Sequence, residues 1–103
     1  MTFAITVQRT ATVTRLCVVG DLDIGTAGQF NHAVHEALRT RPGSLLVDLA
    51  ATTFCDCTGI TALLIARRAA VARDVPYQVI NPTGICLLAL RILDLQSLLT
   101  TRT

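Results

Sequence analysis

The residues most suited to chemistry lie in one short run, Cys55-Asp56-Cys57-Thr58-Gly59. The run combines two thiols, a carboxylate, a hydroxyl and a glycine. It follows the apolar residues 45–47, which end at Asp48, and it precedes apolar residues at helical spacing from Ile60 onward. This pattern predicts a buried strand, a polar loop and a helix whose first turn carries the reactive groups.

Thr58 falls in the predicted first helical turn, where backbone N–H groups lack intrahelical acceptors and the helix dipole favours an anion. The helix therefore tolerates a phosphate on Thr58, which adds about −1.5 to −2 charges beside Asp56. Such a charge repels a docked partner while the fold survives, as a phosphorylation switch requires. The simpler alternative is that Asp56 or Thr58 only caps the helix, and spacing alone favours this alternative.

Other kinds of reactive site find less support. Cys55 and Cys57 supply two metal ligands at most, so no metal site is predicted. Cys17 and Cys86 fall in predicted core elements, where cysteine behaves as a small hydrophobic residue. A redox-active Cys57 at the helix start stays open as an alternative. A receiver domain with Asp56 as phosphate acceptor is disfavoured, because such receivers need a lysine and the chain has none.

Composition indicates one globular domain, residues 1–103, with a real core. Of the 103 residues, 51% are hydrophobic and 16% are charged, and the net charge is +2. The arginines are scattered along the sequence and tryptophan is absent, which argues against nucleic acid and membrane surfaces as partners. The start of the chain does not resemble a signal peptide, and Arg67 and Arg68 interrupt the longest apolar stretch. We therefore expect a cytoplasmic protein without direct membrane insertion.

Hydrophobic periodicity predicts alternating strands and helices. Strands are expected at residues 3–7, 12–19, 45–49 and 77–80, and a last edge strand is an option at 98–101. Helices are expected from Thr26 to the stop at residues 41–43, over residues 58–73, and after residues 81–83 with apolar positions Ile85, Leu88, Ile92 and Leu95. At the first helix, Thr26 and Gln29 fit a capping box. The third strand is apolar without alternation, which favours a central position covered on both faces.

This order, β-β-α-β-α-β-α with an optional final β, predicts an α/β fold. Crossovers through helices imply a mixed, mostly parallel sheet of four or five strands with about three helices. Function in such sheets gathers at the carboxyl ends of the strands. That edge is expected to carry Asp21, Asp23, Asp48, Asn81 and the segment 56–59.

Four motifs together resemble the STAS domain, and more narrowly the bacterial anti-sigma factor antagonists. They are Gly20-Asp21-Leu22-Asp23, Leu46-Val47-Asp48-Leu49, the segment Phe54 to Ile60, and Asn81-Pro82 before a leucine-rich helix. The resemblance runs from about Thr12 to Leu99. It implies a STAS-like single domain that acts as a binding module rather than an enzyme and needs no cofactor of its own.

The resemblance also implies a mechanism of partner switching. The unphosphorylated antagonist binds an anti-sigma factor, which is a serine/threonine kinase, and so releases a sigma factor. The kinase then phosphorylates Thr58 and dissociates, and a serine phosphatase removes the phosphate and so resets the cycle. The partner-binding residues implied by the resemblance are Asp21, Asp23, Asp56, Cys57, Thr58, Gly59 and Ile60. A homodimer is left open.

The chain departs from the antagonist pattern in three ways. Cys57 stands where the family usually has serine, and the acceptor is a threonine. The chain also ends soon after Leu99, before the last helix of longer relatives, which suggests a minimal version. The alternative function is a STAS interaction module of a transporter, lipid-trafficking or stressosome-like assembly.

Overall fold

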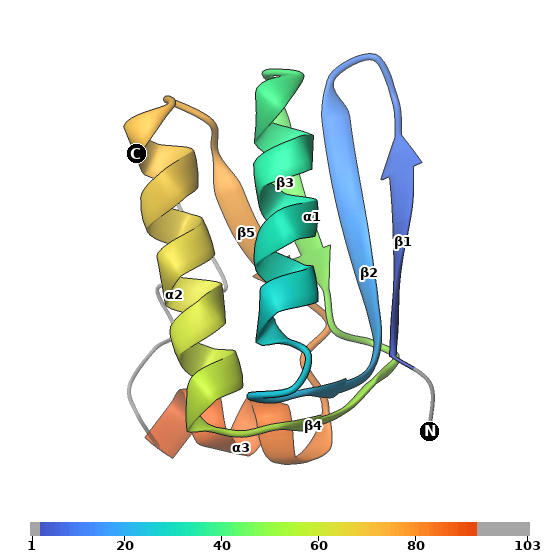
Figure 1. Cartoon of the computed structure of the whole chain (residues 1–103), viewed down its shortest axis with the longest axis vertical. Helices are drawn as coiled ribbons and strands as arrows, with labels where there is room; N and C mark the ends of the chain where they lie inside the picture. The colour runs from blue at the N-terminus through green and yellow to red at the C-terminus, as the bar shows by residue number, and fades with distance from the viewer. Residues whose placement is uncertain (1–2, 93–103) are drawn as a thin grey trace.

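One mixed five-stranded sheet forms the centre of the protein in the computed structural model, which describes residues 3–92 (Figure 1). The strands are β1 (Ala4–Arg9), β2 (Val13–Leu22), β3 (Ser44–Asp48), β4 (Thr52–Cys55) and β5 (Tyr77–Ile80). The order across the sheet is β1-β2-β3-β5. β1 pairs antiparallel with β2, whereas β3 runs parallel to both β2 and β5. β4 pairs in parallel with the last residues of β2, beyond the end of β3.

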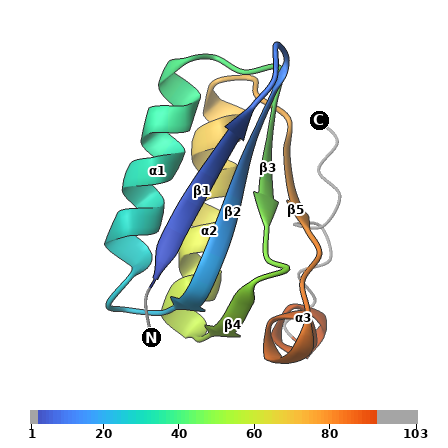
Figure 2. The same ribbon diagram turned by 90° about the vertical axis from the view of Figure 1, so that its right-hand side faces the viewer.

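The described residues contain three helices. They are α1 (Ala27–Arg39), α2 (Cys57–Ala72) and α3 (Gly84–Ile92). α1 and α2 pack side by side on the same face of the sheet, and α3 lies at the end of the sheet against β4 (Figure 2). The predicted α/β class, the element order and the mostly parallel pairing are thereby confirmed.

The core lies between the sheet and the α1–α2 pair. Alternate residues of β2 point into it, so that Leu16, Val18 and Leu22 are fully buried. Phe30 of α1 meets them from the helical layer and is also fully buried. Burying a side chain of this size contributes about 1.5–3 kcal/mol, which makes this face the main source of stability. β3 lies between β2 and β5, so its expected central position is confirmed. Among the described residues α1 and α2 cover one face of the sheet, where β3 buries Leu45 and Val47, whereas Leu46 is half-buried.

The strand β4 was missed by sequence reasoning, which predicted a polar loop there. Its four residues bury only Thr52 and Cys55, so they show no alternating apolar pattern. Two tertiary contacts hold it: Gly20 N–H donates to Ala51 C=O at 3.1 Å, and the Thr52 hydroxyl donates to Val18 C=O at 2.9 Å. Because β4 continues the pairing, β2 extends to Leu22 rather than ending before Gly20.

The start of α1 also differs from the prediction. Thr26 is the N-cap residue, but its hydroxyl makes no capping hydrogen bond, so the predicted capping box with Gln29 is wrong. The hydroxyl instead donates to Asp21 C=O at 2.7 Å and accepts from Asp23 N–H at 2.9 Å. Thr26 therefore fixes the connection between β2 and α1. The predicted strand at 98–101 lies outside the described residues.

Candidate functional site

The first turn of α2 is capped by Asp56. Its backbone is extended, with φ −91° and ψ −171°, and its Oδ1 accepts from Gly59 N–H at 2.9 Å. Its C=O accepts the first intrahelical bond, from Ile60 N–H at 2.9 Å. The expectation that a residue of this run caps the helix is confirmed for Asp56. Thr58 is consequently free of the capping role.

Thr58 is the second residue of α2 and is half-buried. Within residues 3–92 its hydroxyl makes no hydrogen bond, whereas the Thr61 hydroxyl one turn later donates to Cys57 C=O at 2.8 Å. The backbone N–H groups of the first two helical residues have no carbonyl acceptor within the helix, and the helix dipole favours an anion near them. This turn can hold a phosphate on Thr58 without breaking an existing side-chain bond.

Gly59 brings α2 into direct contact with the end of β2. A Cβ on Gly59 would lie 2.2 Å from the Leu22 carbonyl oxygen and 2.8 Å from Cys55 Sγ, so no larger residue fits. Since Leu22 is flanked by Asp21 and Asp23, this approach places the acidic segment beside the helix start. The structure therefore brings Asp21, Asp23 and the 56–59 turn together, as the sequence predicted. We call these residues the acidic edge.

Both aspartates of the β2 end have local structural roles. Asp21 Oδ1 accepts from the Thr53 hydroxyl at 2.6 Å and so ties β2 to β4. Asp23 Oδ1 accepts from Gly25 N–H at 2.9 Å and stabilises the turn into α1. Their contact with a partner stays a prediction.

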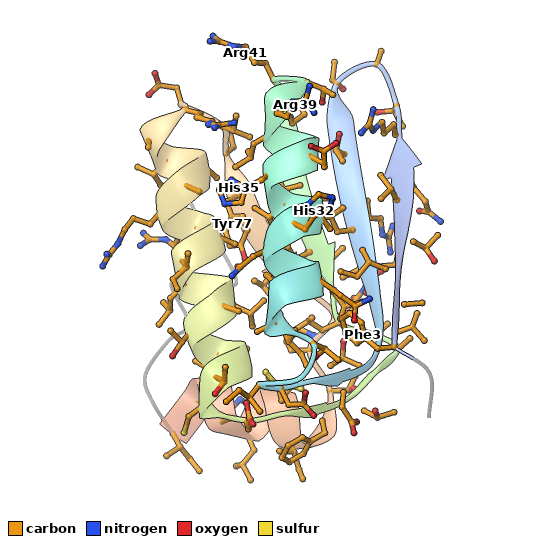
Figure 3. All side chains as sticks on the ribbon, viewed as in Figure 1. Phe3, His32, His35, Arg39, Arg41 and Tyr77 are labelled. Carbon is orange, nitrogen blue, oxygen red and sulfur yellow. The ribbon has the colours of Figure 1, made fainter. Side chains whose placement is uncertain are left out.

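The acidic edge has no cationic partner within the described residues. The two salt bridges among the described residues join Arg15 to Asp48 and Arg39 to Glu36, and neither involves a residue of the acidic edge. Arg39 and Arg41 lie at the end of the molecule opposite α3 (Figure 3). The acidic edge is therefore available to a basic surface of another molecule.

Asp48 and Asn81 do not join the acidic edge. Asp48 is paired with Cys17 in the register, and β2 continues past that position to Leu22. Asp48 Oδ2 accepts from Arg15 Nε at 3.0 Å and also from Arg15 Nη2, while its Oδ1 accepts from Asn81 Nδ2 at 3.2 Å. Asp48 ends β3 and Asn81 directly follows β5, so both lie at carboxyl ends of strands, as expected. They are separate from the acidic edge because β3 ends before the part of β2 that pairs with β4.

The cluster around Asp48 controls its ionisation. Burial by itself raises the pKa of Asp48, but hydrogen bonds from Arg15, Ala50 N–H and Asn81, with the Arg15 charge, bring the pKa below its ordinary value. The ionised Asp48 carboxylate, at the end of β3, thus accepts hydrogen bonds from β2 and from the residue after β5 and links these elements. The arrangement is structural rather than reactive.

Sequence reasoning missed the apolar residues beside the acidic edge. Ile24, directly after Asp23, is 81% exposed, and Phe54, opposite Asp21 in the β2–β4 register, is 39% exposed. Exposed apolar residues of this size next to unpaired carboxylates are typical of a binding surface. The only sequence signal was a lone isoleucine between Asp23 and Gly25.

The apolar positions used to predict α3 point outward. Ile85, Leu88 and Ile92 are 55%, 56% and 72% exposed, and the helix buries Cys86 and Leu90 instead. The helix that these positions predicted is confirmed as α3, although Leu95 lies outside the described residues. Because α3 is apolar on nearly every side, its sequence carries no periodic signal for the face that packs.

The cysteines divide between the core and the surface. Cys86 is buried as predicted, Cys17 is only half-buried, Cys55 is buried, and Cys57 is exposed at the start of α2. In residues 3–92 no cluster of three histidine, cysteine or acidic side chains could hold a metal ion.

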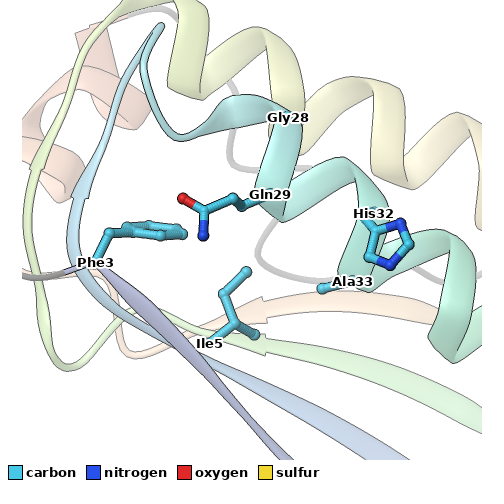
Figure 4. A pocket seen from close by; sticks show the side chains of 6 residues that line it. All are labelled: Phe3, Ile5, Gly28, Gln29, His32 and Ala33. Carbon is cyan, nitrogen blue, oxygen red and sulfur yellow. The ribbon is translucent and has the colours of Figure 1, made fainter.

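The groove between β1 and α1 is separate from this site. It has a volume of about 430 Å³ and is lined by Phe3, Ile5, Gly28, Gln29, His32 and Ala33 (Figure 4). None of these residues belongs to the acidic edge. None of the described helices is both long and apolar enough to cross a membrane.

Comparison with known proteins assigns the fold. The family model described as "Mlab, STAS domain" matches residues 5–100. An anti-sigma factor antagonist from Mycobacterium paratuberculosis is 18% identical, with a TM-score of 0.84 over 95% of this chain and 83% of that one. The Bacillus cell fate determinant SpoIIAA in its phosphorylated form is 17% identical, with a TM-score of 0.74 over 97% and 92%. A sulfate transporter family protein from Wolinella succinogenes is 15% identical, with a TM-score of 0.71 over 82% and 69%. No curated protein sequence matches the chain significantly.

Proposed function

Since the chain belongs to the STAS domain family, we propose that it is an anti-sigma factor antagonist controlled by phosphorylation of Thr58. In its unphosphorylated form it binds a cognate anti-sigma factor kinase and thereby releases a sigma factor. In this proposal it is a binding module in the cytoplasm and a substrate of the kinase, not an enzyme, and the kinase binds the ATP.

One observation carries the proposal: Thr58 lies within the acidic edge, at a capped helix start, and its hydroxyl has no hydrogen-bond partner among the described residues. The cap by Asp56 keeps the turn folded without using the Thr58 hydroxyl. The neighbouring Thr61 hydroxyl is committed to a backbone carbonyl. Thr58 is thus the hydroxyl of this turn that a kinase can use without disrupting an existing bond.

Charge explains how phosphorylation ends the complex. The unpaired carboxylates of Asp21, Asp23 and Asp56 favour a basic partner surface, and Ile24 and Phe54 supply apolar contacts. A phosphate adds about −1.5 to −2 charges at the same place and changes the shape of the contact. Misplaced charge at an interface costs on the order of several kcal/mol, and about 1.4 kcal/mol already lowers affinity tenfold.

Cys57 in place of the family's serine does not prevent this function. It is exposed and lies before Thr58, and the cap that orders the turn comes from Asp56 rather than from residue 57. The serine phosphatase that resets the cycle would act on the same exposed turn.

The test is phosphorylation by the cognate anti-sigma factor kinase with ATP, followed by mass spectrometry. We expect a single phosphate on Thr58, none on Thr58→Ala, and wild-type labelling of the matched control Thr61→Ala. Purified phosphoprotein should bind the kinase at least tenfold more weakly than the unmodified protein. Undiminished labelling of Thr58→Ala, or equal affinity of the two forms, would refute the switch.

A STAS module within a transporter or lipid-trafficking assembly is the second candidate. It is favoured by the match to a sulfate transporter family protein and by the exposed apolar face of α3, defined by Ile85, Leu88 and Ile92. The two candidates differ in the surface that binds. Replacing Leu88 by serine should abolish partner binding for a module that docks through α3, and should leave Thr58 phosphorylation unchanged.

A further inference from the structure

Two buried thiols meet behind the start of α2. Cys55 ends β4 and is 3% exposed, and Cys86 lies in the first turn of α3 and is 1% exposed. They are 31 positions apart in the sequence and come together because α3 packs against β4. Neither residue has a role in the proposed binding surface.

Burial identifies these two residues as the contact between the elements. β4 buries Thr52 and Cys55, and the Thr52 hydroxyl is bound to Val18 C=O. α3 buries only Cys86 and Leu90. Cys55 Sγ also lies close to the position that a Cβ on residue 59 would take, which places the sulfur directly beneath the first turn of α2.

The two thiols affect each other's ionisation. The neighbouring Cys86 thiol, together with burial, raises the pKa of Cys55, and Cys55 lowers the pKa of Cys86. The Cys55 thiol also donates to Asp56 C=O, at 3.9 Å. Ionisation of the pair is therefore favoured at Cys86, and Cys55 keeps its proton. A thiolate beside a neutral thiol is the arrangement in which a first oxidation is followed by disulfide closure.

We propose that Cys55 and Cys86 form a reversible disulfide when a hydroperoxide oxidises the protein. The Cys86 thiolate attacks the peroxide oxygen, the O–O bond breaks, and a sulfenic acid forms with release of hydroxide. The Cys55 sulfur then attacks the Cys86 sulfur, its proton leaves with the hydroxyl group as water, and the S–S bond closes. In total two thiols and one hydrogen peroxide give one disulfide and two waters.

Access to the thiols comes from α3. This helix has nine residues and buries only two of them, so it can open locally at a lower free-energy cost than the rest of the core. Opening exposes Cys86 and uncovers Cys55. Once formed, the disulfide ties α3 to the residue that precedes the Asp56 cap.

The test uses the full reduced chain, treated with hydrogen peroxide and then alkylated in denaturant. We expect a monomer in which two of the four cysteines resist alkylation, with peptide mapping that joins Cys55 to Cys86. The matched control is a Cys17→Ser, Cys57→Ser variant, which keeps only the proposed pair and should oxidise in the same way. Dithiothreitol should restore all thiols, and Cys86→Ser, checked for folding by circular dichroism, should form no internal disulfide.

A second readout follows α3 itself. Amide hydrogen exchange in α3 should slow at least several-fold in the oxidised monomer, because the cross-link removes the local opening. Full alkylation of Cys55 and Cys86 after peroxide treatment would overturn the proposal. So would a disulfide that joins Cys55 to Cys57, or unchanged exchange in α3. None of these outcomes depends on Thr58 phosphorylation, so the proposed function is tested separately.

Discussion

Replacing Gly59 by alanine tests how closely α2 must approach β2. The new Cβ would lie 2.2 Å from the Leu22 carbonyl oxygen and 2.8 Å from Cys55 Sγ, and both distances are shorter than van der Waals contact. The first obstacle is the backbone carbonyl of Leu22, the last residue of β2, which cannot rotate aside as a side chain could. The start of α2 therefore has to move away from the end of β2.

The size of the effect follows from two opposing contributions. Overpacking of a filled site costs about 1–3 kcal/mol, and a clash with backbone belongs at the upper end of this range. Alanine in place of glycine restores about 0.4–1 kcal/mol by restricting the unfolded chain. The net loss of unfolding free energy is then about 2 kcal/mol, which lowers Tm by about 8–16 °C for a chain of this size.

The chain offers a matched control in Gly28. This residue also lies in the first turn of a helix, α1, but nothing lies within 4 Å of the position a Cβ would take. Gly28→Ala is expected to raise the unfolding free energy by about 0.4–1 kcal/mol. Urea denaturation of both variants and the wild type, followed by circular dichroism, measures the difference.

The two glycine variants should change stability in opposite directions. If Gly59→Ala is as stable as Gly28→Ala, the close approach of α2 to β2 is not a constraint on the fold. The placement of Thr58 beside Asp21 and Asp23 would then lose its physical basis.

Two further variants test buried polar contacts. Asp48→Asn should lower the unfolding free energy at neutral pH by about 1–3 kcal/mol, because it weakens charged hydrogen bonds from Arg15. Since the folded pKa of Asp48 is lowered, this difference is fully present above the ordinary carboxyl pKa and fades as pH falls through the folded value; a difference constant to pH 2 would contradict it. Tyr77→Phe removes the bond from its hydroxyl to Leu63 C=O, 3.0 Å long and buried, and should cost about 1 kcal/mol in urea unfolding. No loss in this variant would show that the hydroxyl contributes nothing to stability.

Much of the fold was predictable because the apolar pattern is local and strong. The β-branched residues of β2 and the apolar stripe of α1 indicated both elements, and the Arg41-Pro42-Gly43 stop limited the helix. The run from Asp56 to Gly59 carried enough information to place Thr58 in a first helical turn. Local sequence determines such features, since period and capping depend on residues within one or two turns.

Tertiary structure decided the features that depend on residues far apart in the chain. β4 exists because Thr52 and Ala51 bond to β2, and no pattern within its four residues indicates that. The outward face of α3 could not be predicted, because its residues are apolar all round and only packing selects Cys86 and Leu90 for burial.

The candidate site shows the same division. Sequence alone determined which residues could carry a phosphate and which carboxylates could accompany it. Only the folded chain separated Asp48 from that group, because β3 ends before the edge where β2, β4 and α2 meet. Only the folded chain showed why residue 59 is glycine, since the Leu22 carbonyl that excludes a Cβ lies 37 positions earlier in the sequence. Contacts of this range depend on how the layers pack, which the local pattern of side chains does not encode.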